Sequence, residues 1–237
     1  MIEEFFYLNP HFLDYMGFLV KIAGKTLEDI DVFLEEAVET VINAGLIAFP
    51  TNSVYGLGGD PCNLEVIDRI YDIKYRDRTK GLLLLVADTE EAEKIAEFNR
   101  PGYKLAECFW PGQLTLVLKR KEPNIIPPEV TAYKKTIGIR VPENEIILTI
   151  LKKLKSKGHF GAIIGTSANY SGEPPSISGD EIAKKFLTPI DLILDGGKTK
   201  SKVPTTIVDC TSEDFKFLRI GIIKEDQIID YIDSNLE

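Results

Sequence analysis

The amino-acid sequence predicts an α/β sandwich in which helices flank a mixed sheet. Two observations support this prediction. Short apolar runs bounded by Gly or Pro alternate with amphipathic helical segments through the first two thirds of the chain. Near the end, predicted strands follow one another directly, which is typical of a sheet with both parallel and antiparallel neighbours.

The spacing of apolar residues sets the expected elements. The first helix should begin at Thr26, which forms a capping-box-like pair with Asp29, and should end before Gly45. Further helices are expected at residues 63–75, 89–98, 103–109, 146–154, 179–186 and 225–232. Strands are expected at residues 46–49, 82–87, 114–119, 136–141, 161–165, 192–194, 206–209 and 215–219.

The composition is that of an ordinary globular protein, with 237 residues of which 44% are hydrophobic and 27% charged. Because no repeat or linker divides the chain, we expect one domain, residues 26–237, behind an N-terminal extension, residues 1–25. The apolar stretch from Phe12 to Ile22 contains Asp14, lacks a basic flank and is too short to span a bilayer. We therefore expect it to pack on the domain, and we expect no membrane partner.

The charge and the cysteines limit the function classes. A net charge of −9 and a pI near 5.0 argue against a broad nucleic-acid surface, so a phosphate site should be a local basic patch. Three separated cysteines without C-x-x-C spacing fit a reducing cytoplasm. With two histidines, a His-based metal site is not expected, although phosphate oxygens could still hold a hard cation.

The densest basic segment runs from Lys74 to Lys80. If this segment is extended, then Lys74, Arg76, Arg78 and Lys80 share one side and form a basic edge that suits a polyphosphate. The structural alternative is that Lys74 only complements the end of the preceding helix. As surface charges, Lys74 and Arg76 should each contribute about 1 kcal/mol or less to stability.

Polar residues recur where predicted strands end. Thr51, Asn52 and Ser53 follow one strand, and Thr166, Ser167 and Asn169 follow another. Ligand sites of α/β sheets lie in such loops, so we expect both loops to meet at one concave face. The sequence contains neither a complete P-loop nor a complete dinucleotide-binding fingerprint.

Six segments with ordered spacing resemble the YrdC-like threonylcarbamoyl-AMP synthase family, of the single-domain type, over roughly residues 26–221. They are Pro50–Gly58, Lys74–Leu82, Trp110–Thr115, Ile139–Pro142, Thr166–Gly172 and Leu218–Gly221. The resemblance implies a YrdC-like twisted mixed sheet flanked by helices, with a concave basic ligand site. Three positions depart from the common pattern of the family: Ser53, Asp77 and Leu85 stand where many relatives have threonine, proline and histidine.

The resemblance implies a cytoplasmic nucleotidyltransferase that forms threonylcarbamoyl-AMP and pyrophosphate from L-threonine, bicarbonate and ATP. This is the first step of the threonylcarbamoyladenosine modification of tRNA, and a tRNA-modifying transferase complex would act downstream. ATP is a substrate, and Mg²⁺ would be held mainly by its phosphates. Since carbamate and ATP are both anions, fixed cations should supply much of the catalysis, because two unit charges about 4 Å apart interact by roughly 4 kcal/mol at an effective dielectric of 20.

On the same pattern, the resemblance implies a role for each motif residue. The catalytic residues would be Lys74, Arg76, Ser167 and Asn169. L-Threonine would be bound by Ser53, Arg140 and Thr205. ATP would be bound by Arg76, Lys80, Thr136, Asn169 and Arg219.

Two other functions stay open at this point. In one, the basic segment and Tyr75 contact RNA and no reaction occurs. In the other, the chain transfers a carbamoyl group, as do hydrogenase-maturation carbamoyltransferases that contain a similar domain. Those proteins also carry acylphosphatase and zinc-finger segments, which this sequence lacks.

Overall fold

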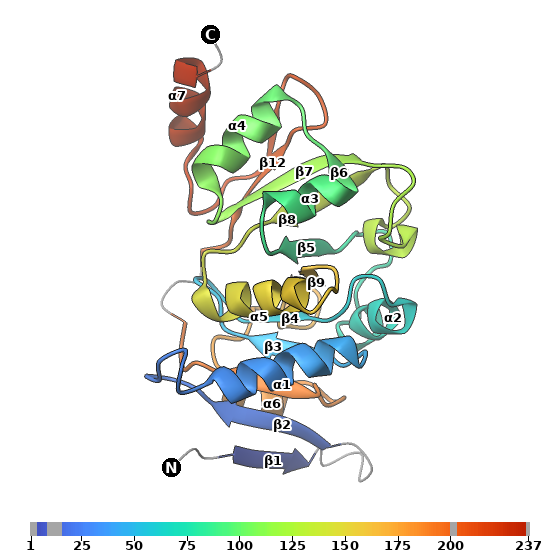
Figure 1. The fold of residues 1–237 in the computed structure, drawn as a ribbon, viewed down its shortest axis with the longest axis vertical. Coiled ribbons are helices and arrows are strands. Elements are labelled where there is room, and N and C mark those ends of the chain that lie inside the picture. Colours follow the sequence, from blue (N-terminus) through green and yellow to red (C-terminus); the bar gives the residue numbers. More distant parts are fainter. Residues whose placement is uncertain (1–3, 9–15, 200–202, 236–237) are drawn as a thin grey trace.

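A computed structural model describes residues 4–8, 16–199 and 203–235, and it places two sheets one above the other (Figure 1). The first sheet has the order β1-β2-β11-β3-β4-β10. Its strands are β1 (Glu4–Leu8), β2 (Met16–Lys21), β11 (Leu192–Asp195), β3 (Ile47–Phe49), β4 (Gly56–Gly58) and β10 (Thr166–Ser167). Parallel and antiparallel neighbours both occur, since β11 runs parallel to β2 and β3 whereas β3 and β4 are antiparallel.

The second sheet has the order β13-β12-β7-β8-β5-β9, and the short strand β6 pairs with β7 beside this path. Its strands are β13 (Lys216–Arg219), β12 (Thr206–Asp209), β7 (Leu114–Arg120), β8 (Thr136–Arg140), β5 (Leu83–Val86), β9 (Ala162–Ile164) and β6 (Ala96–Glu97). The α/β fold class with mixed sheets is therefore confirmed. The sequence predicted one sheet, whereas the structure contains two.

The two sheets meet where β4 of the first passes β9 of the second. The Ile164 N–H donates to Gly59 O at 2.9 Å. Gly58 allows this approach, because a Cβ built on it would lie 1.8 Å from Ile164 O. Neither strand exceeds three residues, so the sequence pattern could not reveal which sheet each one joins.

Seven α-helices and one 3₁₀-helix are present in the described residues. They are α1 (Asp31–Ile42), α2 (Leu64–Ile73), α3 (Thr89–Ile95), α4 (Arg100–Phe109), α5 (Glu145–Ser156), α6 (Gly179–Lys185), α7 (Glu225–Asn235) and η1 (Pro128–Thr131). Five of the α-helices begin with an Asn, Asp or Ser side chain that accepts a hydrogen bond from the first turn. These caps explain why the expected starts agree with the structure within about three residues at most helices.

The first helix begins later than predicted. Thr26 and Asp29 do exchange the hydrogen bonds of a capping box, at 3.0 and 3.2 Å, but they enclose a turn and α1 starts at Asp31. Similarly, α2 ends at Ile73, so Lys74 and Tyr75 lie beyond the helix in which they were expected. The backbone of Tyr75 is left-handed, with φ of 48°, which ends the helix there.

The predicted N-terminal extension supplies strands to the first sheet. Residues 12–15 of its apolar stretch lie outside the described residues, but β2 pairs in parallel with β11 and places Leu19 and Val20 in the core. The extension therefore packs on the rest of the chain. A domain boundary at residue 25 stays a prediction.

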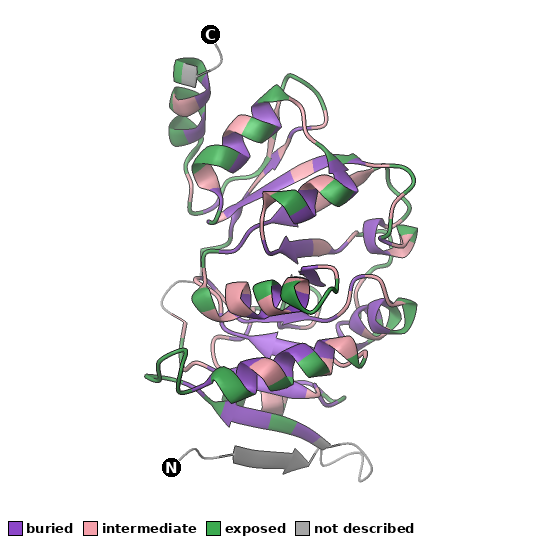
Figure 2. Ribbon diagram, viewed as in Figure 1, coloured by how far each residue is buried: buried purple, intermediate pink, exposed green. Residues whose placement is uncertain are grey.

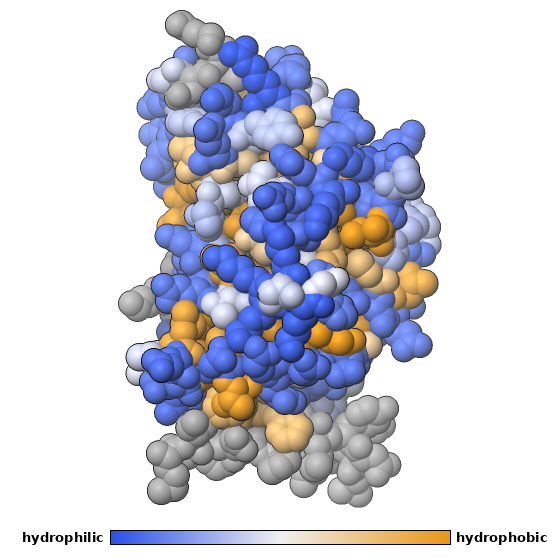
Figure 3. Space-filling model, in the orientation of Figure 1, coloured by the Kyte–Doolittle hydropathy of each residue, from blue (hydrophilic) through white to orange (hydrophobic). Residues whose placement is uncertain are grey.

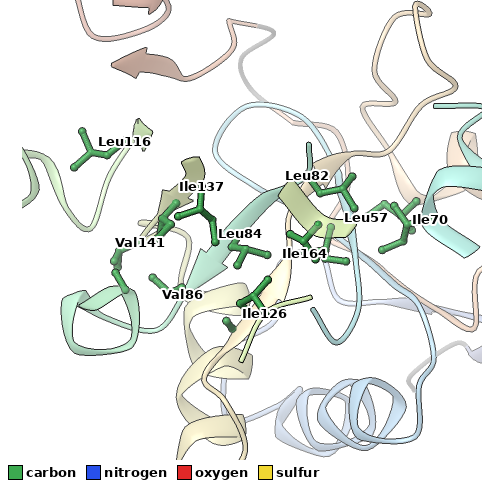
Figure 4. Close-up of a cluster of buried hydrophobic side chains, with 14 of the residues drawn as sticks. Leu57, Ile70, Leu82, Leu84, Val86, Leu116, Ile126, Ile137, Val141 and Ile164 are labelled. Atoms are coloured by element: carbon green, nitrogen blue, oxygen red, sulfur yellow. The ribbon is translucent and has the colours of Figure 1, made fainter. Parts of the chain in front are cut away.

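The core lies on both faces of the second sheet. On β5, Leu84 and Val86 belong to the larger buried cluster, drawn in Figure 4, while Leu85 points into a second cluster with α1 and α5. This alternation is the period of two expected for a strand that is covered on both sides. Figure 2 shows the outer faces of α1 and α5 exposed and their inner faces buried.

The outer surface over α1 and α5 is mainly hydrophilic (Figure 3). Ion pairs join the two helices there: Lys153 Nζ lies 2.5 Å from Glu35, and Lys157 Nζ lies 3.0 Å from Glu39. These groups are partly exposed to solvent, so each ion pair contributes little to stability.

The sheet junction predicts a large difference between two glycine substitutions. Gly58→Ala should lower the free energy of unfolding by about 3 kcal/mol, because the new methyl group meets a backbone oxygen that cannot move alone. Gly138→Ala is the matched control: its Cβ would find its nearest neighbour at 3.6 Å, so the change should be within about 1 kcal/mol. Urea denaturation of both variants checks this, and equal effects would contradict it.

Candidate functional site

A cavity of about 680 Å³ lies on one face of the second sheet. Alternate residues of neighbouring strands form its floor, because paired residues point to the same side of a sheet. Strand pairing puts Gly138 between Leu83 and Val117, and puts Ile207 between Thr115 and Arg219. The volume is in the range of small-molecule sites.

Two loops of the first sheet close the cavity. Thr51 and Ser53 come from the loop after β3, and Thr166 and Ser167 form β10 after the end of β9. Antiparallel pairing of β10 with β4 holds the loops together. The predicted meeting of these two polar loops at one concave face is confirmed.

Arg140 ends β8 and faces the cavity. It is buried, and its Nε donates to Gly112 O at 2.6 Å. In the described chain no residue accepts from its Nη1 or Nη2, which leaves both terminal nitrogens for a ligand. Burial lowers the pKa of Arg140 to about 10, against the opposing charge of Glu143, so the group stays cationic at neutral pH.

Thr205 and Arg219 form a second polar cluster in the cavity. Arg219 Nε donates to Thr205 O and its Nη2 donates to Thr205 Oγ1, both at 2.9 Å. The Thr205 hydroxyl also lies 3.3 Å from the Thr115 hydroxyl. Partial burial lowers the pKa of Arg219.

Arg76 faces the cavity from the segment after α2. Its Nε donates to Lys80 O at 3.2 Å and its Nη2 donates to Gly81 O at 2.8 Å. Burial lowers its pKa, while the nearby Tyr71 and Asp77 oppose that change. Thr136, at the start of β8, lines the same cavity.

Lys74 lies behind the wall of the cavity and is 2% exposed. Its Nζ donates to Ser167 O and, at 2.6 Å, to Asn169 O, so it supports the loop that carries these two residues. The expectation that Lys74 is a surface charge is wrong. The reason is that Lys74 caps α2 with helical backbone and lies three and four residues after the buried Tyr71 and Ile70, so its side chain continues the inward face of the helix.

The basic edge expected from residues 74 to 80 does not form. The segment is a turn, and Arg78 points back to α2, where it pairs with Asp68 and Asp72. Lys80 is exposed and is not among the side chains that line the cavity. Of the four basic residues, Arg76 faces the cavity and Lys74 supports it.

Ser167 and Asn169 differ in exposure. Ser167 is exposed at the rim, whereas Asn169 is 8% exposed and its Nδ2 donates to Tyr170 O at 2.7 Å and Glu173 O at 2.9 Å. The Asn169 Oδ1 has no hydrogen-bond partner among the described residues. A buried acceptor of this kind is ready for a ligand donor.

Four cations of the site share one feature. The donors of Lys74, Arg76, Arg140 and Arg219 contact backbone carbonyl oxygens, and in the described parts of the chain none of the four pairs with a carboxylate. No ion pair with a carboxylate therefore offsets the charge of Arg76, Arg140 or Arg219 within these residues. A cavity with this electrostatic character attracts anions.

Sequence reasoning missed several residues of the cavity. Lys134 adds a cation from the loop before β8, Glu173 adds a carboxylate, and Gly138 forms the floor between Leu83 and Val117. Gly138 could have been noticed, since a glycine in the middle of a strand often marks close approach of a ligand. Lys134 and Glu173 lie in loops and carry no such signal.

The fold and the cavity define an α/β protein whose cations face a site for anionic ligands. The chain belongs to the Sua5/YciO/YrdC family: the model of this family, which is described as "Telomere recombination", matches residues 39–221. The family resemblance inferred from the six motifs is thus confirmed.

Relatives with assigned names support the same conclusion. The threonylcarbamoyl-AMP synthase of Pyrococcus abyssi (strain GE5 / Orsay) is 35% identical over 184 residues, which are 77% of this chain and 52% of that protein. A putative threonylcarbamoyl-AMP synthase of Methanocaldococcus jannaschii is 33% identical over 205 residues, which are 86% of this chain and 93% of that protein. The chain therefore spans about half the length of the first relative and nearly all of the second.

The fold also resembles a solved structure of the family. The crystal structure of P. abyssi Sua5 complexed with L-threonine superposes with a TM-score of 0.81 at 31% identity, covering 90% of this chain and 60% of that chain. In the described residues of this chain, no helix has the length and apolar character needed to cross a membrane.

The burial of Lys74 predicts a pH dependence of stability. Burial, with the charges of Arg76 and Lys185, lowers the pKa of Lys74 from 10.5 to about 7. Between these values the unfolded chain binds the proton more tightly than the folded one, so stability should rise with pH from about 7 to 10.5. The slope cannot exceed about 1.4 kcal/mol per pH unit for one proton.

Urea denaturation of the wild type and Lys74→Met between pH 7 and 9.5 measures this effect. The stability of the wild type relative to Lys74→Met should increase over the interval, because methionine does not titrate. Lys80→Met is the control, since Lys80 is exposed and its removal should leave the pH profile unchanged. Parallel profiles for the wild type and Lys74→Met would contradict the pKa assignment.

Proposed function

We propose that this protein forms threonylcarbamoyl-AMP and pyrophosphate from L-threonine, bicarbonate and ATP, for the modification of tRNA. The observation that carries the proposal is the set of carbonyl-held cations, Arg76, Arg140 and Arg219, around one cavity. Anionic substrates need such uncompensated charge. The names of the relatives and the threonine complex of P. abyssi Sua5 support this choice of substrates.

L-Threonine would bind at the end of the cavity that contains Ser53, Arg140 and Thr205. The two free terminal nitrogens of Arg140 match the two oxygens of a carboxylate. Ser53 is buried beside Thr51, whose hydroxyl lies 3.4 Å from that of Ser53, so the hydroxyl pair could bind the amine or hydroxyl of threonine.

ATP would bind between Arg76, Thr136 and Arg219, with Asn169 contributing its unpartnered Oδ1 as an acceptor. Lys80 would reach the phosphates from the rim. The catalytic contribution of Lys74 would be to hold the carbonyl groups of Ser167 and Asn169 so that the Ser167 hydroxyl faces the substrates. Lys134 would add a further cation at this end.

The reaction requires two anions to approach each other. The threonine amine and bicarbonate give a carbamate and release one water molecule. A carbamate oxygen then attacks the α-phosphorus of ATP while the bond from that phosphorus to the bridging oxygen of pyrophosphate breaks. Arg76 and Arg219 would stabilise the charge on the phosphates in a partly desolvated cavity, where such contacts are stronger than in water. Arg140 would hold the carbamate in line.

Mg²⁺ would enter with ATP as part of the substrate. The lining of the cavity in the described residues includes one carboxylate, Glu173, and its Oε2 lies 2.8 Å from Lys185 Nζ. This donor set suits an ion held mainly by phosphate oxygens. The ion would neutralise phosphate charge when bound.

The free thiols of Cys62, Cys108 and Cys210 suit the reducing cytoplasm, where a tRNA-modifying transferase complex would take the product.

The structure argues against RNA binding at the basic segment. Arg78 is already paired with Asp68 and Asp72, and Lys74 is buried. Two of the four basic residues are therefore unavailable for contact with RNA phosphates. The alternative of carbamoyl transfer is kept as an outcome of the test.

Pyrophosphate release from ATP is the direct test of the proposed function. Release should need both L-threonine and bicarbonate, so omission of either one should reduce it to background. Release that continues without threonine would indicate another acceptor, and release that depends on carbamoyl phosphate would indicate carbamoyl transfer. Absence of release under all conditions, with detectable RNA binding, would favour the RNA-binding module.

The geometry of Arg140 predicts how the enzyme chooses its amino acid. Arg140→Lys keeps the charge but loses the paired donors, so the KM for threonine should rise about tenfold or more with little change in the KM for ATP.

Serine lacks the methyl group of threonine, which is worth about 1 to 3 kcal/mol in a fitted pocket. 2-Aminobutyrate lacks the hydroxyl, so it should be the poorer of the two substrates. Equal turnover of all three amino acids at matched bicarbonate would contradict the assignment of this end of the cavity.

A further inference from the structure

The segment from Trp110 to Thr115 is a sequence motif to which the proposed function assigns no role. It connects α4 to β7 as a closed turn, in which Trp110 Nε1 donates to Leu114 O at 2.8 Å. The Trp110 ring is 9% exposed and meets Phe98 edge-on at 6.1 Å. The turn is therefore fixed in place before it reaches the cavity.

One side of this turn holds Arg140. Gly112 O accepts from Arg140 Nε at 2.6 Å, and Gly112 N donates to Val141 O at 2.9 Å. Two bonds to neighbouring residues fix both the position and the angle of the guanidinium group. A Cβ on Gly112 would lie 2.2 Å from Phe109 O, so any other residue there must move the turn.

The other side of the turn holds the segment that carries Thr205. Thr206 N donates to Gln113 O at 3.2 Å, and the hydroxyl groups of Thr115 and Thr205 lie 3.3 Å apart. Thr115 is 2% exposed. Arg140 and Thr205 come from distant parts of the chain, yet both are bonded to this one turn.

The hydrogen bonds of Thr205 indicate a direction. A hydroxyl has one hydrogen to donate and two lone pairs that accept. Arg219 Nη2 donates to Thr205 Oγ1 and fills one lone pair. If the Thr115 hydroxyl donates to the second lone pair of Thr205 Oγ1, the hydroxyl hydrogen of Thr205 is left to donate to a ligand acceptor in the cavity.

We propose that the turn from Trp110 to Thr115 positions the threonine-binding end of the cavity, and that Thr115 makes Thr205 a hydrogen-bond donor to the amino-acid substrate. The inference rests on the proposed function, because it takes Arg140 and Thr205 as ligands of threonine. Thr115 acts through Thr205 and is a positioning residue. It should affect amino-acid binding more strongly than ATP binding, which it reaches only through the bond from Arg219 to Thr205.

Isothermal titration calorimetry with L-threonine and, separately, with ATP tests this inference. Thr115→Val removes the hydroxyl at nearly constant volume, and the Kd for threonine should rise about tenfold, which corresponds to the loss of one hydrogen bond. The Kd for ATP should change by less than about twofold, within the range of a neutral substitution. Thr115→Ser keeps the hydroxyl and should bind threonine like the wild type.

A second variant covers the case in which Thr115→Val does not fold. Gly112→Ala should displace Gly112 O from Arg140 and weaken threonine binding, again without a matching loss for ATP. If the wild type binds threonine, and both Thr115→Val and Gly112→Ala bind it with the same affinity as the wild type, this inference is overturned. The proposed function is not affected by that result. Equal losses for threonine and ATP, or Thr115→Ser as weak as Thr115→Val, would also overturn the inference. Absence of threonine binding by the wild type would overturn the proposed function as well.

Discussion

Backbone carbonyl groups hold the cations of the site, and the rest of the structure depends on this interaction. Each of Lys74, Arg76, Arg140 and Arg219 donates to one or two carbonyl oxygens. A carbonyl oxygen accepts the hydrogen bond and leaves the positive charge of the donor in place. A carboxylate would accept the hydrogen bond and would also neutralise the charge. The fold must therefore bring six carbonyl groups to defined positions, which are those of Lys80, Gly81, Gly112, Ser167, Asn169 and Thr205.

The contrast between Arg76 and Arg78 shows how local geometry separates function from stability. Both lie in one short turn after α2, but Arg78 points back and pairs with Asp68 and Asp72, while Arg76 points into the cavity. Arg78 also stacks over the Tyr71 ring, at 5.2 Å from its centroid. The protein thus neutralises one guanidinium group on the helix and keeps the other available for an anion.

The sequence was sufficient for the fold class, for most elements and for the two polar loops, because apolar spacing and capping residues act locally. It was insufficient for the orientation of the basic segment. Whether the residues after Lys74 form an extended edge depends on where α2 ends and on the left-handed backbone of Tyr75, which turns the segment. The division into two sheets depends on contacts at Gly58 and Ile164, which are far apart in the chain.

The most direct test of this account compares ATP affinity in two matched variants, Arg76→Gln and Arg78→Gln, by isothermal titration calorimetry. Both substitutions remove one guanidinium group from the same turn. The account predicts that Arg76→Gln weakens ATP binding by about tenfold to a hundredfold, as expected for a charge-assisted hydrogen bond, and that Arg78→Gln changes it by less than about twofold. Equal losses in the two variants would contradict it, because they would mean that net charge alone, and not the carbonyl-held cation, attracts the nucleotide.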